Sequence, residues 1–221
     1  MSKLKLGVLI SGRGSNLQAL IDACAAPGFP AEIALVLSNK ADAFGLERAS
    51  GAGIATAVVD HRGYPGDKPA FEAAMDAALR EAGVELVCLA GFMRLLSPWF
   101  VGQWHNALIN IHPSLLPSFK GLDTHERALA AGVRFHGCTV HYVRPEMDEG
   151  PIIAQAAVPV LPGDDGHSLA DRVLLSEHRL YPHAVRLIAE GRARVDGDLV
   201  RIDGPASELA ALVNPPLNQP L

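Results

Sequence analysis

The stretch Asn110-Ile111-His112-Pro113 combines the residue types and the spacing best suited to chemistry in this chain. It ends an apolar, strand-like run. Side chains alternate along a strand, so Asn110 and His112 point the same way while Ile111 turns into the packing. Pro113 stops the strand because it has no backbone N–H for the ladder. Two donors held side by side suit a carbonyl oxygen; the alternative is a structural histidine before a proline-rich loop.

A second candidate is the glycine loop SGRGSN at residues 11–16, between a predicted strand and a predicted helix. Backbone N–H groups and the helix dipole favour an anion there, and glycine lets a phosphate come close to the backbone. Ser15 or Asn16 can instead cap the helix. Leu17 replaces the third glycine of a dinucleotide site, and Ser38-Asn39 replaces the acid expected after the second strand. A monophosphate is therefore favoured over NAD or ATP.

Asp148 follows a strand-like run, residues 137–143, in a loop rich in turn residues. Loops at strand ends are where α/β sheets carry their chemistry. If this loop folds back over Asn110 and His112, an ionised carboxylate beside the imidazole favours the imidazolium form. The alternative is an ordinary turn residue.

Strands and helices alternate through most of the chain, which predicts how these residues are positioned. We expect strands over 6–10, 33–37, 55–59, 86–90, 107–111, 137–143 and 152–160, and helices after the glycine loop and over 43–52, 69–82, 97–104, 124–131 and 168–190. This order predicts an α/β fold of Rossmann type, a mostly parallel twisted sheet with helices on both faces. One domain over 1–192 and a C-terminal hairpin and tail over 193–221 are expected.

The composition of the chain disfavours binding to nucleic acid and association with a membrane. The chain has 221 residues, 49% of them hydrophobic, and a formal net charge of -5. Such a charge disfavours binding to nucleic acid, which requires a concentrated basic surface. Three widely spaced cysteines in apolar contexts suggest reduced core residues. Without a signal peptide or a long apolar span, we expect a cytoplasmic protein with no membrane association, as a monomer or homodimer.

Six motifs in the same order carry a resemblance to a known family. They are SGRGSN at 11–16, SNKADAFG at 38–45, LAGFMRLL at 89–96, NIHPSLLP at 110–117, MDEGP at 147–151 and EHRLYP at 177–182. In this combination the chain resembles the phosphoribosylglycinamide formyltransferases from about residue 4 to about residue 192. The resemblance implies a formyltransferase-like fold. It also implies transfer of a formyl group from 10-formyltetrahydrofolate to the glycinamide amine of a purine precursor, without a metal.

The resemblance also implies roles for individual residues. Asn110, His112 and Asp148 match the catalytic trio of the family. Gly14, Ser15 and Asn16 match its phosphate-binding segment, and Glu177 matches a carboxylate that binds the ribose. The folate co-substrate is expected to contact Lys68, Met93, Arg94, Leu95, Leu96, Asn110, Val143, Arg144, Pro145, Glu146, Met147 and Asp148. Residues 113–134 correspond to a mobile cover of the family's site.

Several other readings are open at this point. Methionyl-tRNA formyltransferase and formyltetrahydrofolate deformylase share the Asn-x-His-Pro-Ser motif, but each usually has a further domain for which this chain has no room. A folate-binding or nucleotide-binding protein without catalysis is an answer of a different class. Cys138 and His141 have a zinc-like spacing but should face opposite sides of a strand, so a structural role is favoured. Among the other histidines, His125 is the best candidate for a substrate contact.

Overall fold

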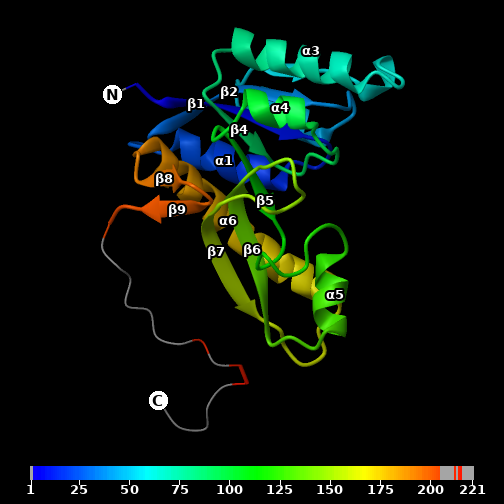
Figure 1. Cartoon of the computed structure of the whole chain (residues 1–221), viewed down its shortest axis with the longest axis vertical. Helices are drawn as coiled ribbons and strands as arrows, with labels where there is room; N and C mark the ends of the chain where they lie inside the picture. Colours follow the sequence, from blue (N-terminus) through cyan, green and yellow to red (C-terminus); the bar gives the residue numbers. More distant parts are fainter. Residues whose placement is uncertain (1, 205–211, 213, 216–221) are drawn as a thin grey trace.

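The computed structural model describes residues 2–204, 212, 214 and 215. The main sheet of this part of the chain has seven strands in the order β3-β2-β1-β4-β5-β6-β7 (Figure 1). Its strands are β1 (Leu4–Ile10), β2 (Ala31–Ser38), β3 (Thr56–Val58), β4 (Leu86–Leu89), β5 (Leu108–His112), β6 (Phe135–Tyr142) and β7 (Ile152–Pro159). The helices are α1 (Ser15–Ala25), α2 (Phe44–Gly51), α3 (Lys68–Glu81), α4 (Pro98–Gln103), α5 (Thr124–Ala130) and α6 (Gly166–Ala189), with a 3-10 turn, η1 (His61–Gly63).

The predicted mostly parallel sheet is confirmed. Strands β1 to β5 pair in parallel, and β6 and β7 are antiparallel to their neighbours. Each predicted strand and helix forms, with ends displaced by a few residues. Parallel strands need crossover connections, and the helices between β1 and β5 provide them.

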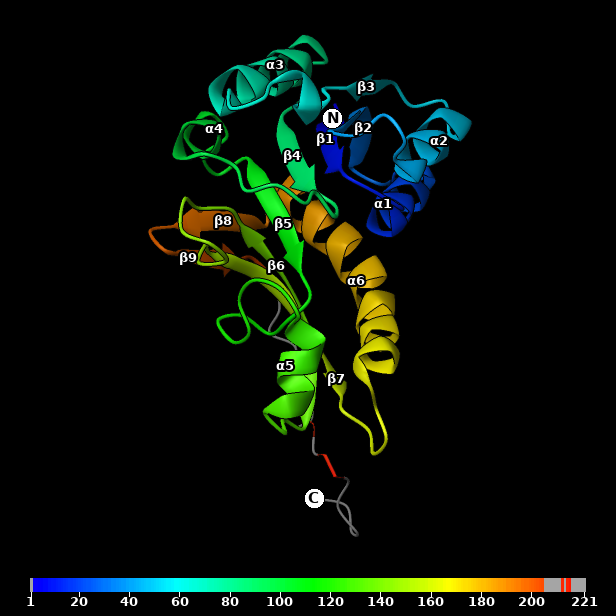
Figure 2. The ribbon, with the colours of Figure 1, turned by 90° about the vertical axis from the view of Figure 1, so that its right-hand side faces the viewer.

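Helices cover both faces of the sheet, as expected. One core joins the sheet to α1 and α6 and includes Leu17, Ile109 and Val185. The other joins the opposite face to α3 and α4 and includes Met75 and Phe100. Figure 2 shows α1 and α6 on one side of the strands and α4 on the other. Because both faces are covered, the central strand β4 is apolar and buried along its whole length.

The order in which strands are added to the sheet reverses at β1. This reversal leaves space for a binding site at the ends of the strands. Strand β1 lies between β2 and β4, so the chain builds the sheet outward from β1 in both directions. At such a point the loops after neighbouring parallel strands diverge, which leaves room for a ligand beyond their carboxyl ends. The glycine loop follows β1, and the segment 90–97 follows β4.

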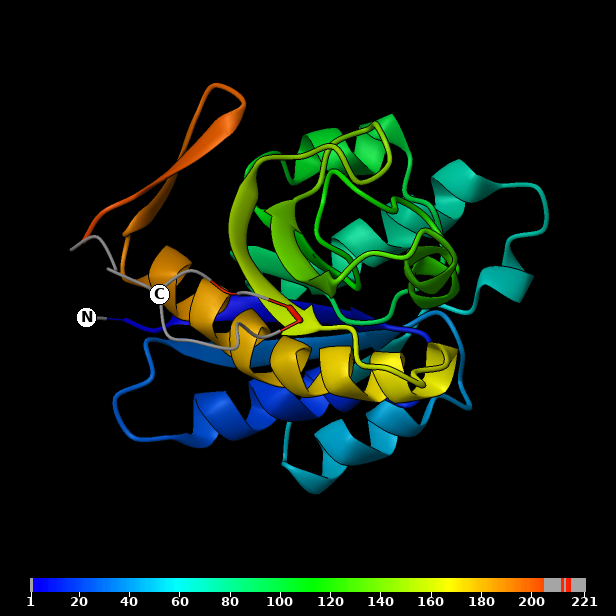
Figure 3. The ribbon, with the colours of Figure 1, turned by 90° about the horizontal axis from the view of Figure 1, so that it is seen from below.

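A small hairpin follows α6. Strands β8 (Ala193–Asp196) and β9 (Leu199–Ile202) pair in antiparallel fashion, as predicted, and Figure 3 shows them projecting beyond the end of α6. The division into a domain over 1–192 and a C-terminal part over 193–221 stays a prediction, and residues 205–211, 213 and 216–221 of that tail lie outside the described residues. None of the described helices is both long enough and apolar enough to cross a membrane.

The pairing of β6 with β7 requires a glycine at position 137, which gives the first testable prediction. A Cβ atom there would overlap the backbone carbonyl of Ala156 on β7. We expect Gly137→Ala to lower the free energy of unfolding by about 1–3 kcal/mol, measured by urea denaturation. Gly102→Ala on α4 is the matched control, because a Cβ there meets nothing within 4 Å. Equal stabilities of the two variants would contradict the prediction.

Candidate active site

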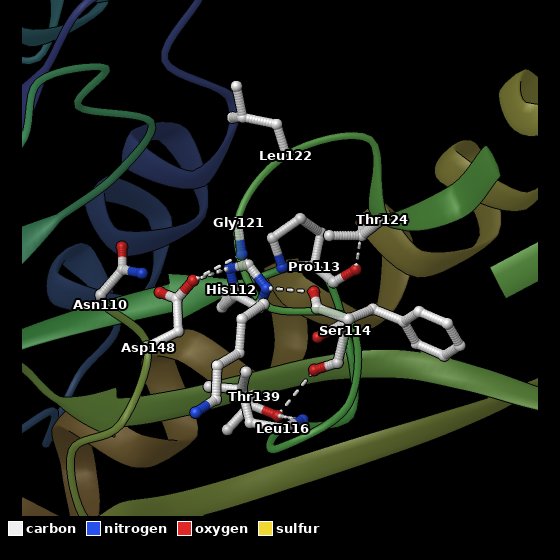
Figure 4. Close-up of polar contacts among 12 residues, drawn as sticks. Asn110, His112, Pro113, Ser114, Leu116, Gly121, Leu122, Thr124, Thr139 and Asp148 are labelled. Carbon is white, nitrogen blue, oxygen red and sulfur yellow. Dashed lines mark hydrogen bonds and ion pairs between the residues drawn. The ribbon is translucent and has the colours of Figure 1, made fainter. Parts of the chain in front are cut away.

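Strand β5 and the loop after β6 bring the predicted trio together. Asn110 and His112 leave β5 on one face, while Ile111 lies in the core on the other. Asp148 approaches from its loop until its Oδ2 atom is 3.6 Å from His112 Nδ1 (Figure 4). The predicted contact between Asp148 and His112 is therefore confirmed. The side chains of His112 and Asp148 are 6% and 12% exposed, so water screens this pair only weakly.

The loop that follows β5 supplies further partners to the trio. His112 Nε2 lies 3.1 Å from the carbonyl oxygen of Phe119, and the backbone N–H of Gly121 donates to Asp148 Oδ2 at 2.9 Å. Both ring nitrogens of His112 therefore face oxygen acceptors. The contact of Nε2 with the Phe119 carbonyl is at hydrogen-bond distance, whereas that of Nδ1 with Asp148 is slightly longer.

The glycine loop leaves the start of α1 open. Gly14 adopts a left-handed conformation with φ of 70°, and no side chain caps the helix. The alternative in which Ser15 or Asn16 caps α1 is therefore wrong, because both residues lie inside the helix and Gly14 is its N-cap residue. Gly45 N donates to Gly12 O at 3.0 Å, and a Cβ on Gly14 would collide with Gly45. This contact between two glycines shapes a helix start that can accept an anion.

Asn16 and Glu177 meet across 161 residues of sequence. Asn16 Nδ2 donates to Glu177 Oε2 at 2.7 Å, and both residues are buried. Burial raises the pKa of Glu177, and the hydrogen bond from Asn16 opposes that shift. Helices α1 and α6 thus bring the predicted phosphate segment and the predicted ribose ligand to one place.

The predicted folate segment is exposed at its centre. Met93 and Leu95 are 75% and 73% exposed, whereas Leu96 packs against the second core. Arg94 lies beside Lys68 in the lining of a cavity of about 150 Å³, together with His61, Tyr64, Gly66 and Phe71. The structure therefore brings the two predicted cationic contacts together.

Along the second predicted folate segment, residues 143–148, the side chains change from partly buried to exposed. Val143 packs against the second core, and Arg144 donates to Asn106 Oδ1 at 2.6 Å. Its next three residues, Pro145, Glu146 and Met147, are exposed. A second cavity, of about 230 Å³, lies beside this segment and includes Asp148 in its lining. There Lys120 Nζ pairs with Glu149 Oε1 at 2.6 Å and joins the loop after β5 to the loop after β6.

Comparisons with known proteins show the family to which the chain belongs. The sequence profile of a family described as formyl transferase matches residues 4–185. The chain belongs to the formyl transferase family. Within the family it is 45% identical over 201 residues to the phosphoribosylglycinamide formyltransferase of Escherichia coli strain K12, covering 91% of this chain and 94% of that protein.

Two further relatives extend the comparison. A crystal structure of glycinamide ribonucleotide transformylase 1 from Symbiobacterium toebii has a TM-score of 0.87 and 51% identity, covering 90% of this chain and 94% of that one. The trifunctional purine biosynthetic protein adenosine-3 of Gallus gallus is 53% identical over 194 residues, or 88% of this chain. The matched part is only 19% of the length of that trifunctional relative.

His141, for which the sequence favoured a structural role, lies against the trio in this member of the formyl transferase family. Its Nδ1 lies 3.0 Å from the Tyr142 carbonyl, which can only accept, so Nδ1 carries the proton. Its Nε2 then accepts from Asn110 Nδ2 at 3.4 Å, and it lies 3.9 Å from Asp148 Oδ1. Burial lowers the pKa of His141 to about 4, which favours this neutral form. The register between β5 and β6 identifies His141 as a neighbour of the trio, because it pairs His141 directly with Asn110.

The predicted placement of Cys138 and His141 on opposite sides of their strand is confirmed. Cys138 is buried in the first core, while His141 contacts the trio. Over residues 2–204, 212, 214 and 215, no three His, Cys, Asp or Glu side chains gather as metal ligands would. Ser114 is buried and donates to the Ser118 carbonyl at 2.6 Å. The ring of His125 packs edge-on against His136 with centroids 5.2 Å apart, and its contact with substrate stays a prediction.

Burial of His136 predicts a loss of stability in mild acid. Burial lowers the pKa of His136 to about 4, below the value of 6.5 for an exposed histidine. The unfolded chain therefore binds a proton first, and stability falls as the pH drops from about 6.5 towards 4. We expect His136→Gln to reduce the loss of unfolding free energy between pH 7 and pH 5 by on the order of 1 kcal/mol in urea titrations. The exposed control His105→Gln should keep the wild-type pH profile, and an unchanged profile in His136→Gln would contradict this account.

Proposed function

We propose that this chain transfers the formyl group of 10-formyltetrahydrofolate to the amine of 5'-phosphoribosylglycinamide, a step in the synthesis of the purine nucleotide IMP. The observation that carries the proposal is the convergence of Asn110, His112 and Asp148 in a chain that belongs to the formyl transferase family. Its similarity to phosphoribosylglycinamide formyltransferases over nearly their full length supports the choice of acceptor.

The mechanism is direct attack. The neutral glycinamide amine forms a bond to the formyl carbon, and negative charge builds up on the formyl oxygen. Asn110 and protonated His112 donate to that oxygen, which replaces the Phe119 carbonyl as the acceptor of the His112 Nε2 proton. The bond from the formyl carbon to the folate nitrogen then breaks, and the amine proton passes to that nitrogen. Asp148, whose Oδ2 lies 3.6 Å from His112 Nδ1, orients the imidazole and positions a water for the proton transfer.

The acceptor binds between α1 and α6. Its phosphate lies at the open helix start formed by Gly14, Ser15 and Asn16, where the backbone N–H groups and the dipole favour an anion. Its ribose hydroxyls donate to Glu177, a buried carboxylate with acceptor capacity beyond the bond from Asn16. This arrangement favours a small ribose phosphate over a nucleic acid.

The folate co-substrate lies on the other side of the trio. Lys68 and Arg94 attract its carboxylates into the cavity that they line. The exposed side chains of Met93 and Leu95, with Leu96, offer apolar contact to its aromatic part. Residues 143–148 close around the pterin from the second side.

We also infer a reducing compartment, the cytoplasm, because Cys24, Cys88 and Cys138 are all free thiols. The oligomeric state, monomer or homodimer, stays a prediction. Light scattering coupled to size-exclusion chromatography distinguishes the two forms.

Removal of the trio side chains is the first test of the mechanism. We expect His112→Ala and Asn110→Ala each to lower kcat by about 10²–10³-fold, as loss of a donor to a developing oxyanion does. Asp148→Asn should also lower kcat, because it removes the carboxylate that orients His112. Turnover is measured with 10-formyltetrahydrofolate and glycinamide ribonucleotide as substrates. Asp198→Asn, an exposed carboxylate in the turn of the hairpin, is the matched control and should keep the wild-type kcat. Near-normal turnover of all three variants would overturn the assignment.

The same assay separates the proposal from the related activities. Formylated product should appear only when folate and glycinamide ribonucleotide are both present. Release of formate without an acceptor would instead indicate a deformylase, and binding of folate without any turnover would indicate a protein that has lost catalysis.

Glu177→Gln tests the acceptor site separately. An amide offers one acceptor oxygen where the carboxylate offers two, so we expect the KM for glycinamide ribonucleotide to rise by about tenfold. The KM for the folate should stay within a factor of two, because Glu177 contacts Asn16 of the glycine loop and not the proposed folate segments. Glu81→Gln, on the exposed side of α3, is the control. An equal rise of both KM values would contradict a role confined to the acceptor.

A further inference from the structure

The segment from Gly91 to Ser97 lacks regular structure, although it is predicted to hold the folate. Its central side chains are exposed, so packing alone does not define its path. Side chains from elsewhere in the fold hold its backbone at both ends. Gly91 O and Met93 N both bond to Ser11, and Ser97 N bonds to Glu72.

Ser11, the first residue of the glycine loop, holds the first end of this segment. Its N–H donates to Gly91 O at 3.2 Å, and its hydroxyl oxygen accepts from Met93 N at 2.8 Å. The hydroxyl has one proton, which it donates to Asn39 Oδ1 at 2.6 Å. Ser11 and Asn39 are 5% and 1% exposed, so water cannot easily replace these partners.

Glu72 holds the second end from α3. Its carboxylate accepts from Ser97 N at 2.7 Å and also from the Ser97 hydroxyl, and it is 1% exposed. Lys68 Nζ lies 3.8 Å from the same carboxylate and offsets part of its charge. Two buried polar side chains, Ser11 and Glu72, therefore hold the two ends of the segment. Ser11 also belongs to the glycine loop.

We propose that Ser11, with Asn39 behind it, is a positioning residue for the folate co-substrate: its buried hydroxyl fixes the backbone at Met93 and thereby the surface that the folate contacts. The proposal rests on the proposed function. It gives a role to Asn39 of the motif at 38–45, a residue that takes no part in the chemistry described above. Ser11, the first residue of the glycine loop, then physically links the two proposed substrate sites.

Ser11→Ala tests the proposal, because it removes the hydroxyl and keeps the backbone bond to Gly91. We expect the KM for 10-formyltetrahydrofolate to rise about tenfold, a change typical of one lost buried hydrogen bond. The KM for glycinamide ribonucleotide and kcat should change less than threefold. Ser50→Ala, exposed on α2, is the matched control. A purely structural role would instead lower the melting temperature and leave both KM values unchanged.

A second variant tests whether the hydroxyl acts through Asn39. In the double-mutant cycle, Asn39→Ala should raise the folate KM by a similar factor, and the double variant should show little further increase. Multiplication of the two effects, or a rise in both KM values after Ser11→Ala, would overturn the proposal. If Ser11→Ala does not fold, Ser11→Thr, which keeps a hydroxyl, and Asn39→Ala carry the test. Wild-type binding of tetrahydrofolate, measured by calorimetry, separates failure of this proposal from failure of the proposed function.

Discussion

The hydrogen-bonded pairing of β5 with β6 is the constraint on which the candidate active site depends. This pairing sets Asn110 directly opposite His141. The alternation of side chains along β5 then puts His112 on the same face as Asn110. A displacement of the register by one residue would move His141 to the other face of the sheet and leave the Asn110 amide without its acceptor. Strand β6 also leads into the loop that returns Asp148 to His112, so one ladder positions all four side chains.

Around this ladder, the reversal of the sheet at β1 separates the proposed sites of the two substrates. The loop after β1 faces α6 and forms an open helix start beside Glu177. The segment after β4 turns towards α3 and the cavity lined by Lys68 and Arg94. The ends of β1 and β4 are nevertheless neighbours in the sheet. A transfer between two bound molecules requires such an arrangement, with separate sites and a short distance between their reacting ends.

Polar contacts in this region are concentrated where the backbone is irregular. Regular strands satisfy their own N–H and C=O groups, whereas the loops after β4, β5 and β6 need side chains or each other for this purpose. Ser11, Glu72 and Asp148 each accept from a backbone N–H of a loop. Because these acceptors are largely buried, each loop has few alternative conformations of similar energy. The functional loops are thereby held in place by the scaffold.

The sequence by itself determined the order and type of the elements, because hydrophobic periodicity and the positions of Gly and Pro are local properties. It also determined that Asn110 and His112 share a face. Only the tertiary structure decided the partners of these side chains. The contact of Asp148 with His112, the bond of Asn16 to Glu177 and the pairing of His141 with Asn110 join residues 36, 161 and 31 positions apart. Such contacts depend on sheet order and register, which are set by the packing of the whole chain rather than by any short stretch of it.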